Sequence, residues 1–424
     1  MKRNVLIPLL VAGAVFLVAP TLQAEGWQAG DYSNLSISQD QLEQCGQQQQ
    51  VAYPEVEAAI RHKQYNAALK LLGKPSKKSP PALNYLYGKA HYLLAQQHLA
   101  SKPEAAELLE AKQYINLAAN QGYAEAIYDQ AVLFTPAEDA TRKLSLLKKA
   151  ADKQFVPAML TLAEHYFYGI KTFEERNRAQ VLIKKAAELD SAAKIKLASY
   201  YLNEDEQLKN LAGYEKNVDK AIEILYTATT ECNSEAAYKL YQMSIREHKP
   251  NNLPPERALY WLETSAKLGY AKAQGELAEY YYTDQQDGEK SAFWAEQAVE
   301  SGDLKALLTL AKIYYHGIDT EKDLSKALQY YEMALSIDKD NRLVLNQLGI
   351  MYYKGEGGEV DFHKAATLCE RAANKGQAGC QYYLGLMYVN GEGVTQDIDK
   401  GISWMKKSAA QDFVIAKNWL RENW

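Results

Sequence analysis

Residues 382–411 read YYLGLMYVNGEGVTQDIDKGISWMKKSAAQ and join two different segments through the turn GEGV. The first segment carries Leu384 and Tyr388, which are four residues apart and therefore share one face of a helix. The second segment follows Asp397 and carries Lys400 and Trp404. The stretch therefore predicts a helix, a glycine-containing turn and a second helix.

The second segment recurs upstream as a basic residue followed four positions later by a bulky apolar residue. Successive copies are 33 to 42 residues apart, which is the length of one helix pair. The basic positions are Lys400, Lys364, Lys326, Lys290, Arg257, Lys220, Arg178 and Arg142. Because one helix pair cannot cover its own apolar face, this repetition predicts a continuous stack of pairs.

Most of these second segments begin with a residue that can cap a helix. Asp and Asn predominate three residues before the basic position, and their side chains can accept an unpaired backbone N–H. The eight residues are Asp397, Asp361, Asp323, Asp287, Pro254, Asn217, Glu175 and Asp139. Glycines are expected to end helices in a left-handed conformation, as at Gly122, Gly269, Gly302 and Gly376. No strand-like alternation interrupts the series, so we expect an all-α fold.

The residue pattern is clearest in 378–411 and resembles that of Sel1-like repeats, which are relatives of tetratricopeptide repeats with a longer glycine-rich turn. The matching residues are Ala378, Leu384, Gly385, Tyr388, Gly391, Gly393, Val394, Asp397, Lys400, Trp404, Lys407, Ala409 and Ala410. The resemblance covers about residues 121–424 and weakens toward the N-terminus. It implies a right-handed α-solenoid of stacked antiparallel helix pairs.

The chain is expected to contain four consecutive parts. Residues 1–24 carry Lys2, Arg3 and an apolar run from Val5 to Val18, which is typical of a secretory signal peptide. We expect a polar linker or N-terminal arm over 25–50, tetratricopeptide-like helical repeats over 51–120, and a Sel1-like solenoid with a C-terminal capping helix over 121–424. The protein is therefore expected in the periplasm or secreted, without stable membrane insertion.

Charge and motifs exclude several classes of function. The chain has a net charge of −5, and removing Lys2 and Arg3 with the leader gives 46 − 53 = −7, which argues against nucleic acid as a partner. GEGV and GEGGEV lack the strand and the Lys-Ser/Thr ending of a phosphate-binding loop. The seven histidines include no pair at the i, i+4 spacing of a helical metal site. We expect no catalytic residue, no cofactor and no metal.

Four cysteines remain after the leader is removed, in a compartment that is expected to be oxidising. Cys369 and Cys380 lie on either side of a turn between repeats, and a disulfide there would staple two repeats together. The alternative interpretation is a pair of buried free thiols, since free cysteine is a favoured core residue. Pairing of Cys45 with Cys232 is less favoured.

The family resemblance also implies where a partner would bind. In tetratricopeptide-like solenoids the first helix of each pair lines the concave face. The residues carried onto that face are Phe167, Tyr282, Tyr315 and Tyr353, each just after the repeat aromatic, and Tyr382, two positions before the repeat leucine. Tyrosines offer a large contact area and a hydroxyl, so this column is the candidate partner groove. The alternative interpretation is that the tyrosines cover adjacent helices.

Three functions compete on this sequence. The favoured one is an exported, non-catalytic scaffold or adaptor that binds a protein, a peptide or an extended polymer such as a glycan on the concave face. The second is a structural subunit of a cell-envelope or polysaccharide-export complex. The third and least favoured is a cell-wall or β-lactam hydrolase, because the chain lacks a Ser-x-x-Lys placed as a nucleophile motif.

Overall fold

The computed structural model describes residues 35–45, 53–97, 105–169, 172–203, 214–245 and 255–424, and every regular element in these ranges is helical. The helices are α1 (Gln39–Cys45), α2 (Pro54–Arg61), α3 (Tyr65–Leu72), α4 (Pro81–Gln97), α5 (Ala105–Asn120), α6 (Ala124–Leu133), α7 (Ala140–Asp152), α8 (Val156–Tyr168), α9 (Phe173–Leu189), α10 (Ser191–Leu202), α11 (Val218–Thr230), α12 (Ser234–Ile245), the 3₁₀ turn η2 (Pro255–Arg257), α13 (Ala258–Lys267), α14 (Ala271–Thr283), α15 (Gly288–Val299), α16 (Leu304–His316), α17 (Leu324–Ile337), α18 (Arg342–Lys354), α19 (Phe362–Asn374), α20 (Ala378–Asn390), α21 (Ile398–Ala409) and α22 (Val414–Asn423).

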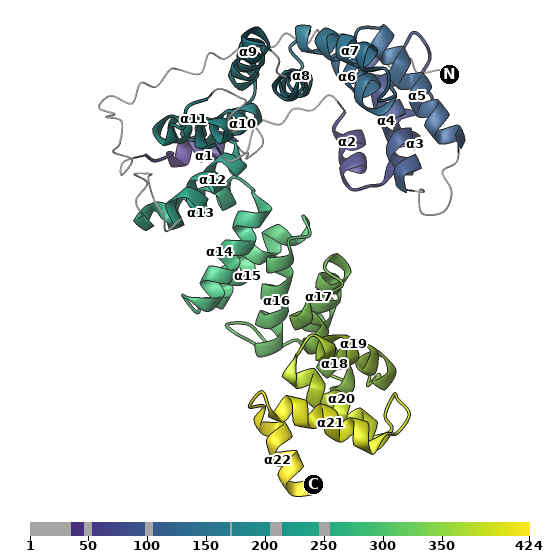
Figure 1. Cartoon of the computed structure of the whole chain (residues 1–424), viewed down its shortest axis with the longest axis vertical. Helices are drawn as coiled ribbons and strands as arrows, with labels where there is room; N and C mark the ends of the chain where they lie inside the picture. Colours follow the sequence, from purple (N-terminus) through teal and green to yellow (C-terminus); the bar gives the residue numbers. More distant parts are fainter. Residues whose placement is uncertain (1–34, 46–52, 98–104, 170–171, 204–213, 246–254) are drawn as a thin grey trace, which may run out of the picture.

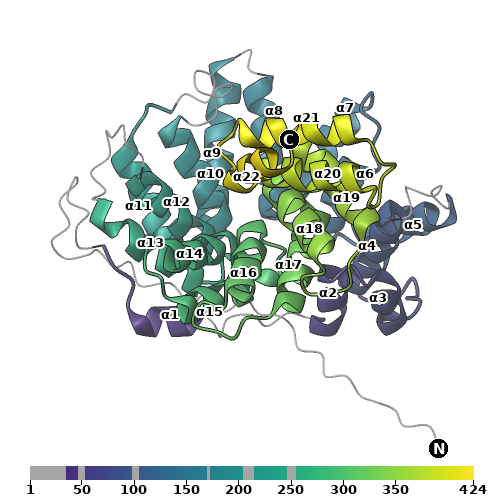
Figure 2. The same ribbon diagram turned by 90° about the horizontal axis from the view of Figure 1, so that it is seen from below.

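From α4 onward the helices alternate as the first and second members of successive pairs. The first helices carry even numbers from α4 to α20, and each packs against the odd-numbered second helix that follows it. Figures 1 and 2 show that the pairs follow one another along a curved stack, with α2 and α22 toward its two ends. The predicted all-α solenoid of antiparallel helix pairs is therefore confirmed.

Capping explains why most second helices start where they do. Asp397, Asp361, Asp323, Asp287, Asn217 and Asp139 each accept the backbone N–H of the residue three positions later. The repeat with Glu175 at this register position differs, because α9 begins one turn earlier. There Thr172 Oγ1 accepts the Glu175 backbone N–H at 3.2 Å. Pro254 lies outside the described residues, and α13 is entered through η2 instead.

The glycine-rich turns pack against the second helix of the preceding repeat. A Cβ atom placed on Gly393 would lie 2.2 Å from the carbonyl oxygen of Phe362, and Gly357 makes the same kind of contact one repeat earlier. Both glycines have positive φ, which L side chains rarely adopt. At the preceding junction the glycine belongs to the second helix, α15, and not to the turn. A Cβ on Gly288 would lie 2.3 Å from the carbonyl oxygen of Ile318. Each of these junctions therefore requires one glycine.

Small residues also let the two helices of a pair approach closely, as the sequence predicted. A Cβ on Gly385 of α20 would lie 2.9 Å from the carbonyl oxygen of Gly401 on α21. The core between the helices contains many fully buried alanines, together with a few large side chains such as Phe167 and Trp261. Leu35 and Ile37 join this core from the N-terminal arm, although they are far away in sequence.

Two disulfides connect parts of the stack. Cys369 and Cys380 are joined across the α19–α20 turn, and a Cβ on Gly349 would lie 2.6 Å from the Cys369 sulfur. Cys45, at the end of α1, is joined to Cys232, in the turn between α11 and α12. This second pairing was the less favoured one, and it joins residues 187 positions apart in sequence. Leu35, Ile37 and Leu42 of the arm pack on the core cluster that includes residues of α11 and α12, and this packing brings Cys45 to the turn between these helices.

Several sequence predictions fall outside the described residues. The signal peptide over 1–24 lies wholly outside them, as do residues 25–34 and 46–50 of the predicted arm. Within 35–45, the arm contains a short helix and two buried apolar side chains. The predicted domain boundaries stay predictions.

Candidate partner-binding surface

Three of the predicted groove tyrosines lie on consecutive first helices and are half-buried. Tyr315 of α16 donates its hydroxyl to Glu356 Oε2 at 2.9 Å, and Tyr353 of α18 donates to Glu392 Oε2 at 3.0 Å. Each acceptor belongs to the glycine-rich turn of the next repeat. Burial raises the pKa of both phenols, and the hydrogen-bonded glutamates raise it further. These tyrosines therefore tie neighbouring repeats together as well as facing solvent.

Tyr282 of α14 differs from the other two tyrosines. In the next repeat, Ile318 stands at the sequence position that Glu356 and Glu392 occupy in theirs, so no carboxylate is offered there. Burial alone raises the pKa of Tyr282. Its hydroxyl is therefore the best placed of the three to meet a partner.

The other two predicted groove residues belong to the core and cannot line an open surface. Phe167 is fully buried, with its ring centroid 5.5 Å from that of Tyr200 in the next first helix. Tyr382 is 8% exposed and packs near Phe413, at 5.9 Å between ring centroids. In both cases the following repeat supplies an aromatic side chain that covers the position. We therefore leave these two residues out of the candidate surface.

A cleft lies elsewhere on the first helices, between α12 and α14. The cleft has a volume of about 510 Å³. Leu259 and Leu262 of α13 form the apolar part of its lining. Tyr241 of α12 and Tyr280 of α14 also line it. Its charged lining residues are Glu256, Glu276, Glu279, Asp284 and Lys305. Four carboxylates against one lysine make the cleft acidic.

Hydrogen bonds fix two of these carboxylates. Tyr238 donates to Glu276 Oε1 at 2.5 Å, and Lys305 Nζ lies 2.7 Å from Glu279 Oε2. Burial works against the charge on Lys305, but the bond to Glu279 and the nearby Glu276 outweigh it and raise the pKa of the lysine. Burial, with Glu276 close by, raises the pKa of Tyr241 to about 12. At neutral pH the tyrosine is therefore a hydrogen-bond donor beside negative charge.

Sequence reasoning missed this cleft, although the repeat register contained a signal for it. Glu276 and Glu279 stand one position before and two positions after the repeat leucine, Leu277. Those two positions share one helix face and point away from the paired second helix. The predicted groove residues stand at other register positions, two before the repeat leucine or just after the repeat aromatic, and the next repeat covers two of them, Phe167 and Tyr382.

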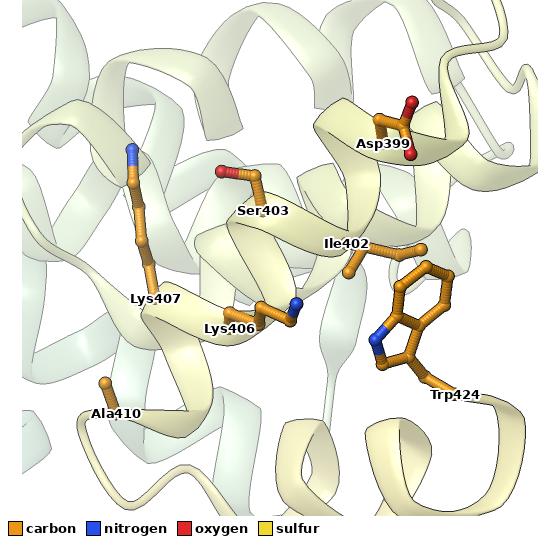
Figure 3. A pocket seen from close by; sticks show the side chains of 7 residues that line it. All are labelled: Asp399, Ile402, Ser403, Lys406, Lys407, Ala410 and Trp424. Carbon is orange, nitrogen blue, oxygen red and sulfur yellow. The ribbon is translucent and has the colours of Figure 1, made fainter.

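A second hollow lies on α21, the second helix of the last complete pair. Its volume is about 530 Å³, and its lining includes Asp399, Ile402, Lys406 and Trp424. Figure 3 shows the Trp424 ring beside Ile402, and Lys406 Nζ lies 5.3 Å from the centroid of the indole. Because Trp424 is 69% exposed, the hollow is shallow and partly formed by a side chain that faces solvent. The cleft between α12 and α14 is the better candidate surface.

In the described ranges, no three or more His, Cys, Asp and Glu side chains come together in a way that could hold a metal ion. Nor is any helix of these ranges long and apolar enough to cross a membrane.

Comparison with protein families identifies Sel1 repeats in six stretches of the chain. The matched residues are 156–191, 248–270, 271–303, 304–336, 344–377 and 378–413. They include the stretch on which the sequence resemblance was strongest. The pair α6–α7 and, apart from Ser191, the pair α10–α11 lie in the same stack but outside the matched ranges. No curated protein matches the chain in sequence.

Solved structures with a similar arrangement of helices include two bacterial proteins. A Sel1 repeat protein from Oxalobacter formigenes has 22% identity and a TM-score of 0.45, with 83% of this chain and 98% of that chain covered. A protective antigen of uropathogenic Escherichia coli that displays an SLR fold has 19% identity and a TM-score of 0.43, with 91% and 90% covered. With its six repeats and its stacked helix pairs, the chain is a Sel1-like repeat protein.

Proposed function

We propose that this protein is an exported, non-catalytic scaffold that anchors an extended segment of a partner protein in the cleft between α12 and α14. A Sel1-repeat solenoid suggests a role in protein interaction. Tyr282 of α14 and Tyr315 of α16 lie on first helices, as Tyr241 and Tyr280 of the cleft do, and are proposed to extend this surface toward the C-terminal repeats.

The cleft itself is the observation that carries this proposal. Leu259 and Leu262 offer apolar contact to an aliphatic side chain, while Glu276 and Glu279 stand at the rim. Lys305 balances only part of the negative charge. The chemistry fits a segment in which lysine or arginine alternates with aliphatic residues, because charge complementarity attracts the basic side chains and apolar burial retains the others.

Export is supported by the N-terminal sequence and by the cysteines. Lys2 and Arg3 precede an apolar run from Val5 to Val18, as in secretory leaders. Disulfides persist mainly in oxidising compartments, and two cysteine pairs are joined in this chain. Expression of the chain with a C-terminal tag in a Gram-negative host, followed by fractionation, should yield a processed form in the periplasm or medium. A full-length form confined to the cytoplasm would contradict export.

Partner binding can be tested by affinity capture from an envelope extract with the chain that begins at Glu25. The test variant combines Glu276→Gln with Glu279→Gln, which removes two rim charges while keeping side-chain size. The matched control combines Glu289→Gln with Glu300→Gln, two exposed residues at the ends of α15 and outside the cleft lining.

We expect the cleft variant to lose a partner that both the wild type and the control retain, and added salt to weaken the same capture. A second variant that changes Tyr282, Tyr315 and Tyr353 to Phe tests the extended surface while keeping all three rings. Identical captures by the wild type and the cleft variant would refute the assigned cleft.

A structural subunit of a larger envelope complex is the second candidate. The last helix, α22, leaves Val414 64% exposed and Ile415 50% exposed. Adjacent apolar side chains of this size are typical of a surface that another protein covers. If this candidate is right, the chain should elute from gel filtration of a native extract in one large complex, and Val414→Lys should release it.

A further inference from the structure

Residues 35–38 form an extended segment that lies over the second helices α11 and α13. Leu35 and Ile37 are 5% and 7% exposed, whereas Ser36 and Ser38 face solvent. Both apolar side chains enter the core cluster that contains Ile222, Leu225 and Trp261. The segment is therefore held as an extended peptide, with alternate side chains buried.

Three side chains of the solenoid bind main-chain atoms of this segment. The Tyr260 hydroxyl accepts the Ile37 backbone N–H at 2.6 Å, and the Tyr226 hydroxyl donates to the Ser36 carbonyl at 3.0 Å. The Arg257 guanidinium donates to the Leu35 carbonyl and lies over the Tyr260 ring, 4.2 Å from its centroid. Contacts to the main chain combined with pockets for alternate side chains are the means by which domains recognise extended peptides.

The segment is retained by a covalent link that is remote from the pockets. Ser38 caps α1, since its hydroxyl accepts the Gln41 backbone N–H at 3.2 Å and the Gln41 side chain accepts the Ser38 N–H at 3.0 Å. Helix α1 ends at Cys45, which is bonded to Cys232. A tether of this kind keeps the segment at a high effective concentration beside the site.

We propose that the face formed by Tyr226, Arg257, Tyr260 and Trp261 is a peptide-binding site that the chain's own residues 35–38 occupy. When the Cys45–Cys232 bond is reduced, the site exchanges this segment for an extended segment of another protein with aliphatic residues at alternate positions. The two sites share α13, but Tyr260 and Trp261 lie on the face of this helix opposite the cleft residues Leu259 and Leu262. The variants that test one site therefore leave the residues of the other unchanged.

The redox step requires a dithiol as reductant. The dithiol is oxidised to an internal disulfide and supplies two electrons and two protons. Each cysteine sulfur receives one electron and one proton, so the S–S bond breaks and two thiols form. After reduction the segment keeps its buried side chains, its main-chain contacts and the packing of Leu42, but it loses the covalent link to Cys232. A competing peptide can then displace it.

The first experiment measures binding of a labelled peptide with the sequence of residues 35–45, in which Ala replaces Cys45. The protein is the chain from Glu25 that carries Leu35→Asp, Ile37→Asp, Cys45→Ala and Cys232→Ala, so that its own segment cannot occupy the site. We expect saturable binding by fluorescence anisotropy. A control peptide with Asp at the positions of Leu35 and Ile37 should bind about a hundredfold more weakly, because two aliphatic side chains are no longer buried.

A matched protein variant tests the main-chain contacts. Tyr260→Phe, added to the same protein, keeps the aromatic ring against Trp261 but removes the hydroxyl that holds the Ile37 backbone. We expect the labelled peptide to bind about fivefold more weakly, which corresponds to one lost hydrogen bond. Equal binding of the two peptides, or no binding by a folded protein, would overturn the proposal.

A second measurement applies if the four substitutions unfold the protein. Hydrogen exchange of residues 35–45 is followed in the chain with Cys369→Ala and Cys380→Ala, so that the dithiol acts on one bond only. We expect reduction to speed exchange of the Ile37 amide about tenfold or more, and millimolar peptide to speed it further. Exchange unchanged by both treatments would overturn the proposal.

A dimer that forms on reduction and is abolished by Leu35→Asp would instead assign the site to a second copy of the chain.

Discussion

The helix pairs α8–α13 and α16–α21 bury similar apolar cores but are held together by different means. In the C-terminal region, Asp323, Asp361 and Asp397 cap the second helices, and glycine turns rest on the preceding repeat. In the N-terminal region, the core includes Leu35 and Ile37 of an arm whose end is bonded to Cys232. One region relies on contacts between sequence neighbours, and the other also on a connection across the stack.

This difference shows how a repeat protein can keep one fold while its repeat signals weaken. Stability in a solenoid is approximately the sum of the repeat stabilities and the interfaces between neighbours. Where turns lack glycine, as at Gln154 and Cys232, non-glycine residues adopt positive φ instead, at a cost in backbone energy. A covalent connection that crosses several repeats can offset such losses.

Removal of each disulfide should show the largest difference between the regions. The Cys45–Cys232 bond closes a loop of 187 residues and the Cys369–Cys380 bond one of 11. A model based on the entropy of the unfolded chain assigns them about 5 and about 3 kcal/mol. We expect Cys45→Ala with Cys232→Ala to lower the free energy of unfolding more than Cys369→Ala with Cys380→Ala does. Urea unfolding without reductant, followed by circular dichroism, measures both, and equal losses would contradict the comparison.

Two tryptophans at the same repeat position provide the next test. Trp261 is fully buried in the N-terminal region, whereas Trp404 is half-buried and its ring lies 4.0 Å from Lys407 Nζ. Trp261→Ala should lower the free energy of unfolding by about 3 to 5 kcal/mol, as for other buried aromatic side chains. Trp404→Ala should cost clearly less in the same urea titration. A larger loss at Trp404 would mean that burial does not control stability at this position.

The sequence predicts the C-terminal region well because its signals are local. The cap at Asp397 and the turn at Gly391 and Gly393 need only nearby residues, so periodicity is enough to place them. The contact of Ile37 with Tyr260 joins residues 223 positions apart, and no local pattern encodes it. The groove prediction was partly wrong at Phe167 for a related reason, since burial there depends on which side chain the next repeat supplies.

A pair of glycines separates the effect of backbone conformation from that of packing in the C-terminal region. Gly376 and Gly393 both have positive φ, but a Cβ on Gly376 meets open space whereas one on Gly393 meets the carbonyl of Phe362. We expect Gly376→Ala to cost about 1 kcal/mol and Gly393→Ala about 2 to 3 kcal/mol. Urea unfolding measures both losses. Equal losses would show that the contact between the Gly393 turn and the preceding repeat does not contribute to stability.

Acidification should produce the smallest effect, and chiefly in the N-terminal part of the stack. Burial lowers the pKa of His91 on α4, although Glu110 and Glu107 attract its charged form. Below the ordinary histidine pKa, the unfolded chain therefore binds more protons than the folded one, and stability falls as the pH falls. In α17, burial opposes the charge of Glu332, but hydrogen bonds from Tyr352 and Lys364 outweigh it and lower its pKa. That contribution is lost only below the ordinary glutamate pKa.

Between about pH 7.5 and about pH 5.5, His91 should therefore respond while Glu332 does not. We expect the urea midpoint of the wild type to fall over this range, and His91→Gln to remove part of the fall because glutamine does not titrate. Glu332→Gln should lower the midpoint at both pH values without changing the difference between them. If His91→Gln leaves the pH dependence intact, another group carries it, since the folded state would then bind a proton at His91 as readily as the unfolded chain does.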